Sequence, residues 1–178
     1  GSNAPAMDLS AACSGFMYAL VTGMQFIKTG TYQRVLVIGA DLMSRTVNPK
    51  DMKTFPLFGD GAGAVVIGPG SEQQGFISYT LGADGHGAEL LEQPAGGTRC
   101  PATPESLAQN LQFLKMDGRS VFKWAIRTLS DSVNQVLDAA SLTADEIDLT
   151  LFHQANIRII DAAANDLGLP MEKVFVNL

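Results

Sequence analysis

An apolar helix followed at once by an apolar strand is the feature that most limits what this chain can fold into. Residues 14–28 carry apolar side chains on nearly every side of a helix, which predicts a buried helix. Residues 34–40 (RVLVIGA) are a continuous apolar run rich in β-branched residues, which predicts a strand covered on both faces. Together they indicate a layered α/β protein. The composition, 46% apolar and 17% charged, agrees with a compact member of this class.

The middle of the chain is rich in glycine. After an irregular connection over residues 41–58, the glycines of residues 59–63 lead into an apolar run that ends at Ile67. The Lys and Ser/Thr of a phosphate-binding P-loop are absent, so we expect a strand whose glycines allow close backbone packing. A second strand near 75–81 is expected to pair with it across the turn at Pro69-Gly70. Residues 82–112 have little periodicity, which indicates a long functional or covering excursion.

The last third of the chain alternates helical and strand patterns. Apolar spacing over residues 121–137 predicts an amphipathic helix, and Thr143 to Glu146 form a capping box. Further elements are expected as a strand at 147–152, a helix at 157–167 that ends at Gly168, and a strand at 174–176. The sequence stops just after that strand begins, so we expect a fragment of a longer protein.

Several classes of function are not expected. The net charge of −6 and the scattered Lys and Arg residues leave no basic stripe for nucleic acid. No apolar segment approaches the roughly 20 residues of a membrane span, and no secretory signal is visible. The two cysteines lie far apart, which favours a reducing cytoplasm over a disulfide framework. No grouping has the spacing of metal ligands, so we expect no metal site.

Cys13 is the first candidate for chemistry. It lies among small residues just before the apolar helix, where the helix dipole and unpaired backbone N–H groups favour a thiolate. The small neighbours leave room for a tight turn and for an approaching substrate. A lone cysteine on an apolar helix is also commonly a buried packing residue, so both interpretations stay open.

His153 is the second candidate. It follows an expected strand and precedes an expected helix, which is where open α/β sheets place ligand sites. There it can hydrogen-bond a developing oxyanion or act as a base toward a thiol, or it can be a core-edge histidine satisfied by backbone. Asn156 is as well explained as the helix N-cap as by catalysis. His86 is expected to be exposed in a loop, and Cys100 is expected to be non-catalytic.

Four motifs in order resemble β-ketoacyl-acyl-carrier-protein synthase III. They are DLSAACSGF (8–16), FGDGAGA (58–64), MDGRSVFK (116–123) and HQANIRI (153–159). The resemblance is colinear from about Pro5 to Leu178. It implies a thiolase-like layered α-β-α-β-α fold, incomplete here, with a partial N-terminal half at residues 1–95 and a linker plus partial C-terminal half at 96–178.

The same resemblance implies an acyltransferase that starts type II fatty-acid synthesis without a cofactor. The cysteine matching Cys13 takes an acyl group from acyl-CoA. The histidine matching His153, with a partner asparagine, supports decarboxylation of malonyl-acyl-carrier protein by hydrogen-bonding the thioester oxygen, and the carbanion then attacks the acyl-cysteine. Acyl-CoA and acyl-carrier protein are therefore the expected partners of a cytoplasmic homodimer.

Other matches to the family are partial. Phe58 matches an acyl-pocket position, and Lys123 and Arg158 match basic positions of carrier-protein docking. Met52 stands where an arginine often contacts the coenzyme A adenine, and Asn165-Asp166 replace docking-helix basic residues. The partner asparagine belongs to a Gly-Asn-Thr-Ser-type motif that these 178 residues lack, and Asn177 does not replace it. We therefore expect the chain alone to be inactive.

Three alternatives remain open from the sequence. The first is a related Cys-His-Asn condensing enzyme of secondary metabolism, of polyketide or quinolone type. The second is a non-catalytic thiolase-fold subunit that shapes an active partner. The third is an α/β binding domain with a buried cysteine, which would have to match four motifs by chance.

Overall fold

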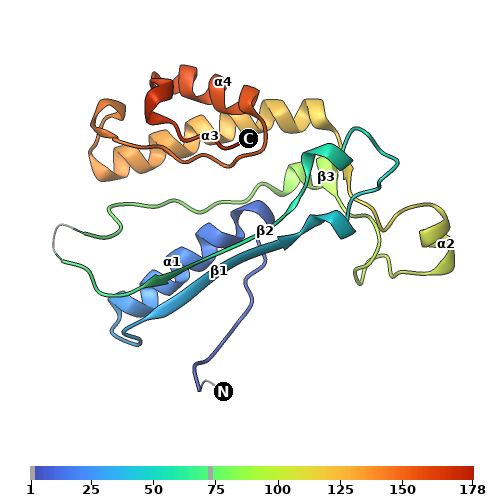
Figure 1. Ribbon diagram of the computed structural model, residues 1–178, viewed down its shortest axis with the longest axis horizontal. Coiled ribbons are helices and arrows are strands. Elements are labelled where there is room, and N and C mark those ends of the chain that lie inside the picture. Colours follow the sequence, from blue (N-terminus) through green and yellow to red (C-terminus); the bar gives the residue numbers. More distant parts are fainter. Residues whose placement is uncertain (1–2, 72–73) are drawn as a thin grey trace. The chain divides into compact units, whose positions relative to one another are not determined.

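The structure is a computed structural model that describes residues 3–71 and 74–178 (Figure 1). The chain divides into two compact units. The first consists of Gly1–Asp41 and Gly61–Phe76, and the second of Leu42–Asp60 and Ile77–Leu178. The units interleave because the connection between the two strands of the first unit belongs to the second. The division at residues 95 and 96 stays a prediction.

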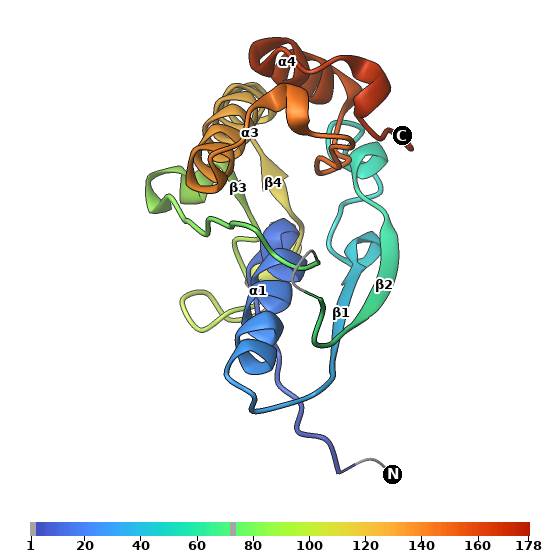
Figure 2. The same ribbon diagram turned by 90° about the vertical axis from the view of Figure 1, so that its left-hand side faces the viewer.

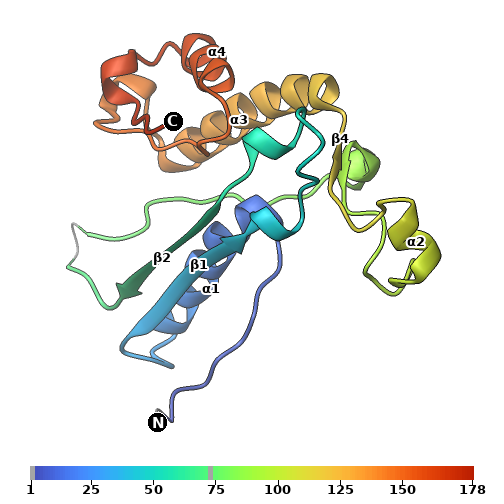
Figure 3. The same ribbon diagram turned by 45° about the vertical axis from the view of Figure 1, so that its right-hand side comes forward.

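The first unit contains a helix and a two-stranded sheet. A 3-10 turn, η1 (Ala12–Ser14), leads into α1 (Gly15–Lys28), and β1 (Val35–Leu42) pairs with β2 (Asp60–Ile67). The two strand arrows run in opposite directions in Figure 3. After α1, Gly30 adopts φ +72°, the left-handed conformation that lets the chain leave a helix without a Cβ clash. The helix and its glycine end are as predicted.

Close packing between α1 and the sheet depends on two glycines. A Cβ at Gly23 would lie 3.1 Å from side-chain atoms of Val35 and Ile67, and one at Gly39 would lie 3.2 Å from the Phe16 ring. This packing buries Val37 to 3% exposure, but Leu36 and Ile38 on the other face of β1 remain 59% and 56% exposed. The prediction of a strand covered on both faces is therefore wrong for this structure, in which α1 covers one face. The expected all-round burial of α1 is wrong for the same reason, since Met17 is exposed.

The glycines at 59–63 lead into a strand, as predicted. The close backbone packing expected of them is not found. A Cβ at Gly59, Gly61 or Gly63 would meet no atom within 4 Å, so these glycines do not serve close packing. The prediction of a strand near 75–81 is also wrong, because these residues, all of them described, form no strand. Instead, the hydroxyl of Ser78 donates to the Val136 carbonyl at 2.7 Å. This segment is held by a helix that follows it in sequence.

The second unit is built around two longer helices. Its elements are η2 (Met43–Arg45), η3 (Phe55–Leu57), η4 (Gly85–Leu90), β3 (Leu91–Glu92), α2 (Pro104–Ala108), β4 (Lys115–Met116), α3 (Gly118–Ala140), η5 (Ala144–Glu146), α4 (Ile157–Leu167) and η6 (Met171–Lys173). The helices α3 and α4 lie side by side in Figures 1 and 2. Between them lies a core of Phe152, Ile160, Ala163, Ala164, Leu169 and Val174, with Leu129 and Val133 of α3 packed against it. No helix in the described residues is both long and apolar enough to cross a bilayer.

Three predictions made from local sequence patterns are confirmed in this unit. Asn156 caps α4, since its side-chain oxygen accepts from the Arg158 N–H at 2.9 Å. Gly168 ends the same helix at φ +67°. The capping box of Thr143 and Glu146 forms around η5. Each of these is a contact between residues a few positions apart, which the sequence pattern specifies directly.

Two long-range expectations differ from the structure. The strands expected at 147–152 and 174–176 shrink to one parallel bridge between Thr150 and Val174. The excursion over 82–112 is more ordered than expected, because β3 pairs antiparallel with β4, with Leu91 opposite Met116 (Figure 2). Within it, Thr103 and Ser106 form a capping box at the start of α2. Two-residue strands and a five-residue helix are too short to give a periodic signal.

Candidate active site

Cys13 lies in the 3-10 turn that leads into α1 and is exposed. The turn is closed by the Ser14 N–H, which donates to the Ala11 carbonyl at 3.1 Å. Ser14 then takes the N-cap position of α1. The buried packing interpretation of Cys13 therefore does not hold in this structure. A thiol in this place is accessible to a reagent and lies at the positive end of a helix dipole.

The backbone immediately before Cys13 is strained. Ala12 has φ +46°, in the left-handed region that residues other than glycine seldom adopt. Strain of this kind persists only where the surrounding structure enforces it, and it concentrates at functional sites. Sequence reasoning missed Ala12, because alanine carries no signal for a positive φ.

His153 is exposed in the short link between the Thr150 bridge and α4. On one side, Phe152 is buried in the core between the helices. On the other, Asn156 begins α4, and the Ala155 N–H donates to the His153 carbonyl at 3.1 Å. Within the part of the chain that the structure describes, no side chain hydrogen-bonds the imidazole of His153. The backbone on both sides of His153 is thus anchored, and its imidazole ring is open to a ligand.

Three of the predicted site residues surround one open pocket in the second unit. Lys123, Asn156 and Arg158 line it, together with Gly118, Arg119 and Phe122, and its volume is about 420 Å³. Sequence reasoning singled out the first three but missed Arg119 and Phe122. Their signal lay in the spacing of residues 118, 119, 122 and 123, which places them on one side of the first turns of a helix.

The electrostatics of this pocket favour an anion. Three cationic side chains line it, and the N-terminal ends of α3 and α4 meet there. Asp117, the N-cap of α3, uses its carboxylate on Ser120, accepting from the hydroxyl at 2.7 Å and from the backbone N–H at 3.2 Å. These bonds lower the pKa of Asp117, with the hydroxyl as the larger cause. The carboxylate is thereby engaged in capping the helix, beside a pocket that suits phosphate or carboxylate.

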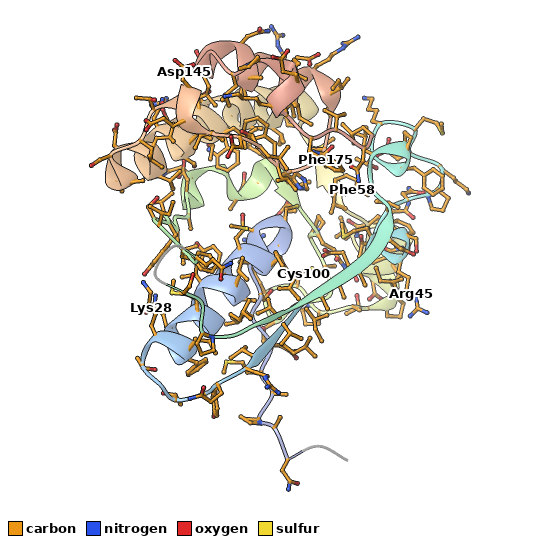
Figure 4. The ribbon with its side chains drawn as sticks, turned by 60° about the vertical axis from the view of Figure 1, so that its left-hand side comes forward. Lys28, Arg45, Phe58, Cys100, Asp145 and Phe175 are labelled. Atoms are coloured by element: carbon orange, nitrogen blue, oxygen red, sulfur yellow. The ribbon has the colours of Figure 1, made fainter. Side chains whose placement is uncertain are left out.

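Phe58 lies at the end of the connection between β1 and β2, just before β2 (Figure 4), and is half-buried. Two residues later, the Asp60 carboxylate accepts hydrogen bonds from Ser44, which fixes the two ends of this connection to each other. Met52, in the same connection, is 72% exposed. Neither residue lines the pocket between the helix ends.

The predicted site residues thus fall in different parts of the fold. Cys13 belongs to the first unit, and the other predicted site residues belong to the second, namely Phe58, Lys123, His153, Asn156 and Arg158. The structure brings together Lys123, Asn156 and Arg158. His86 is fully exposed, as predicted. Among residues 3–71 and 74–178, no three His, Cys, Asp or Glu side chains are grouped as metal ligands would be.

Comparison with known proteins gives consistent matches. Residues 7–85 match the family 3-oxoacyl-[acyl-carrier-protein] synthase III, and residues 137–178 match its C-terminal family. The chain is 50% identical to β-ketoacyl-[acyl-carrier-protein] synthase III of Rhodopirellula baltica, over 100% of this chain and 57% of that protein. It therefore spans about half the length of the curated relatives that it matches.

Solved structures give matches of the same kind. The 3-oxoacyl-(acyl carrier protein) synthase III of Pseudomonas aeruginosa PAO1 superposes with a TM-score of 0.87 at 39% identity, covering 99% of this chain and 52% of that one. The priming β-ketosynthase from the R1128 polyketide pathway gives 0.80 at 34% identity, covering 98% and 51%.

These likenesses define a protein of the thiolase-like fold class, as predicted. The two matched ranges together take in more than half of the sequence. The chain belongs to the 3-oxoacyl-[acyl-carrier-protein] synthase III family.

Proposed function

We propose that this chain carries the nucleophile and the histidine of an acyltransferase that initiates type II fatty-acid synthesis. The reaction joins an acyl-CoA primer to malonyl-acyl-carrier protein and yields 3-oxoacyl-acyl-carrier protein, CO2 and CoA. The observation that carries this proposal is the exposed Cys13 in a strained turn at the start of α1, in a member of this family.

The first step is transfer of the primer to Cys13. The sulfur attacks the thioester carbonyl of acyl-CoA, its proton goes to the leaving thiol, and acyl-cysteine and CoA form. The positive end of the α1 dipole favours the negative sulfur. The small residues around Cys13 leave space for the tetrahedral intermediate.

The second step is condensation. Decarboxylation of malonyl-acyl-carrier protein releases CO2 and leaves an enolate, whose carbon attacks the acyl-cysteine and releases the Cys13 thiolate. We propose that His153 donates a hydrogen bond to the thioester oxygen as it becomes the enolate oxygen, which stabilises the developing charge. Its exposed ring, with backbone anchored on both sides, suits a donor of fixed orientation.

The pocket between the helix ends is proposed to hold the phosphate-bearing arm of the substrate. Coenzyme A carries phosphates, and Arg119, Lys123 and Arg158 supply the positive charge. Lys123 and Arg158 would also take part in docking the acyl-carrier protein, and Asn156 would be a neighbour of the substrate. Phe58 is proposed to line the acyl pocket. With Met52 in place of an arginine, we expect no cationic contact from that position to the adenine.

These 178 residues contain no Gly-Asn-Thr-Ser-type motif, so we propose that they do not complete the condensation alone. The acyl-transfer step depends on Cys13 and is the part of the reaction that can be tested on this chain. The enzyme is proposed to act in the cytoplasm as a homodimer without a bound cofactor.

Mass spectrometry of the intact chain after incubation with a panel of acyl-CoAs tests the proposal. We expect the native chain to gain one acyl group and Cys13→Ser to gain none. Cys100→Ser is the matched control, because Cys100 is the only other cysteine and is half-buried in a loop. Acylation that follows Cys100, or no adduct from any acyl-CoA, would contradict the assigned nucleophile.

A second candidate is a priming condensing enzyme of polyketide synthesis. The likeness to the R1128 priming ketosynthase, at 34% identity, is the observation that favours it. The same panel separates the two by the acyl chain that Cys13 accepts. A chain that folds normally but forms no acyl-cysteine would instead agree with a non-catalytic subunit.

A further inference from the structure

The side-chain amide of Gln154, next to His153, uses its full donor capacity on two backbone carbonyls. Its Nε2 donates to the Phe152 carbonyl at 3.0 Å and to the Phe175 carbonyl at 3.1 Å, while its Oε1 accepts from the Asn177 N–H at 3.0 Å. A primary amide has two N–H groups, and both are satisfied. The side chain is therefore held at three points, two of them on a segment more than twenty residues away.

These bonds continue a parallel pairing that the backbone begins. The Thr150 N–H donates to the Lys173 carbonyl at 2.7 Å, and the Phe175 N–H donates to the Thr150 carbonyl at 2.9 Å. Beyond this bridge the amide of Gln154 takes the next two positions on the partner segment, the Phe175 carbonyl and the Asn177 N–H. The side-chain amide of Gln154 thus acts as an extra peptide group. It extends the parallel pairing, which contains one backbone bridge, between Thr150 and Val174.

In the sequence, His153 lies between two residues that take part in these bonds, Phe152 and Gln154. The residue before it, Phe152, is 7% exposed and packs in the core, and its carbonyl is bonded by Gln154. The residue after it is Gln154 itself. The backbone of His153 is therefore fixed on both sides by one side chain, although His153 is exposed and its ring has no partner in the described part of the chain.

We infer that Gln154 is a positioning residue that orients His153 by tying residues 150–154 to residues 173–177. This inference rests on the proposed function only in one respect, the hydrogen bond that His153 is proposed to donate to a thioester. The orientation itself follows from the three hydrogen bonds. A merely stabilising role would predict a lower melting temperature without a specific change at the imidazole.

Nuclear magnetic resonance of the full 178-residue chain can distinguish these roles. The chain has two histidines, so the ring signals of His153 and His86 can be separated, and His86 serves as an internal reference. In Gln154→Ala we expect the His153 ring signals to shift and broaden while those of His86 stay in place. Exchange of the Asn177 amide proton should rise about fivefold or more, as loss of one ordinary hydrogen bond predicts.

Gln135→Ala is the matched control. Gln135 lies in the same unit and accepts one side-chain hydrogen bond from Thr80 at 3.2 Å, far from His153 in sequence. It should leave the His153 ring and the Asn177 amide unchanged. If Gln154→Ala does not fold, Gln154→Glu decides, because a carboxylate keeps the acceptor for Asn177 and loses both donors. Unchanged His153 signals in a folded Gln154 variant would overturn the inference.

Addition of malonyl-CoA separates this inference from the proposed function. In the native chain it should perturb the His153 ring signals, and in Gln154→Ala this response should be reduced. If malonyl-CoA leaves His153 of the native chain unperturbed while the Gln154 variants still shift its ring, the proposed role of His153 fails and the positioning by Gln154 stands.

Discussion

The carboxylate of Asp60 accepts two hydrogen bonds from Ser44, from its backbone N–H and from its hydroxyl, both at 2.7 Å. The two residues are sixteen positions apart and lie at opposite ends of the connection between β1 and β2. Inside this connection, Thr54 is 2% exposed and its hydroxyl donates to Asp51 at 2.8 Å. Phe58 lies between Thr54 and Asp60 in the sequence. The bonds between Ser44 and Asp60 therefore anchor one end of the segment that carries Phe58.

The first prediction is that Asp60→Asn loosens the segment that carries Phe58. Asparagine can accept one of the two Ser44 bonds but brings an N–H₂ group to the place of the second acceptor. Hydrogen exchange at the Ser44 amide should become faster. Under the proposal that Phe58 lines the acyl pocket, the discrimination among acyl-CoA chain lengths in Cys13 acylation should also weaken. Glu146→Gln is the control, because Glu146 accepts the same pair of bonds from Thr143, both at 2.8 Å. A chain-length profile altered equally by both variants would count against a specific role of Asp60.

The second prediction concerns Ala12. Its φ of +46° costs an L-residue about 1–2 kcal/mol, which glycine avoids. Glycine also gives the unfolded chain more freedom, so Ala12→Gly should raise the free energy of unfolding by at most about 1 kcal/mol. Ala11→Gly, at φ −143°, should instead lower it by about 0.5–1 kcal/mol. Urea unfolding of the two variants measures the difference, and equal destabilisation would show that the turn before Cys13 is not strained.

Local features of the fold could be predicted because their cause lies within a few residues. Asn156 caps α4 with its own side chain, and Gly168 ends the same helix through its own φ. The apolar spacing of α3 likewise follows from the face that packs on Ile160 and its neighbours. For the candidate site, this local logic placed His153 after an expected strand, of which the structure keeps one bridge at Thr150, and Asn156 at the start of a helix.

Features that depend on distant partners could not be predicted. Residues 75–81 are expected from the sequence to pair with β2, but Ser78 bonds to Val136, which lies 58 positions later and whose position depends on the packing of α3. Arg119 joins Arg158 at the pocket only because the starts of α3 and α4 converge. Gln154 looks like an ordinary polar residue until its three partners are known. In each case the partner is set by tertiary packing, which a pattern along one segment does not contain.

The third prediction tests the close approach of α1 to the sheet. Gly23→Val would place a Cβ 3.1 Å from atoms of Val35 and Ile67 and add two methyl groups beyond it, so α1 must shift. We expect a loss of about 1–3 kcal/mol in the free energy of unfolding. Gly61→Val is the matched control in the same unit, since a Cβ there meets nothing within 4 Å and valine suits a strand. Equal effects of the two substitutions would contradict the packing of α1 on β1 and β2.

The fourth prediction is a loss of stability in acid that can be traced to individual carboxylates. Hydrogen bonds lower the pKa of Asp60, through the Ser44 hydroxyl first and then its N–H, and that of Glu146, through the Thr143 N–H first. A carboxyl group whose pKa is lowered in the folded state binds its proton more readily in the unfolded state. Its stabilising contribution is therefore complete above the unfolded pKa and disappears as pH falls through the lower, folded value.

Melting temperatures measured from pH 7 downward should thus stay level until the pH approaches about 4.5, where unfolded glutamates begin to bind protons, and fall below about 4 as aspartates follow. Asp60→Asn and Glu146→Gln should each flatten this decline, because neither amide titrates. Since both groups are exposed, high salt should leave most of the effect in place if hydrogen bonds cause it and remove it if distant charges do. A decline that is equally steep in both variants would mean that these two carboxylates do not contribute to it.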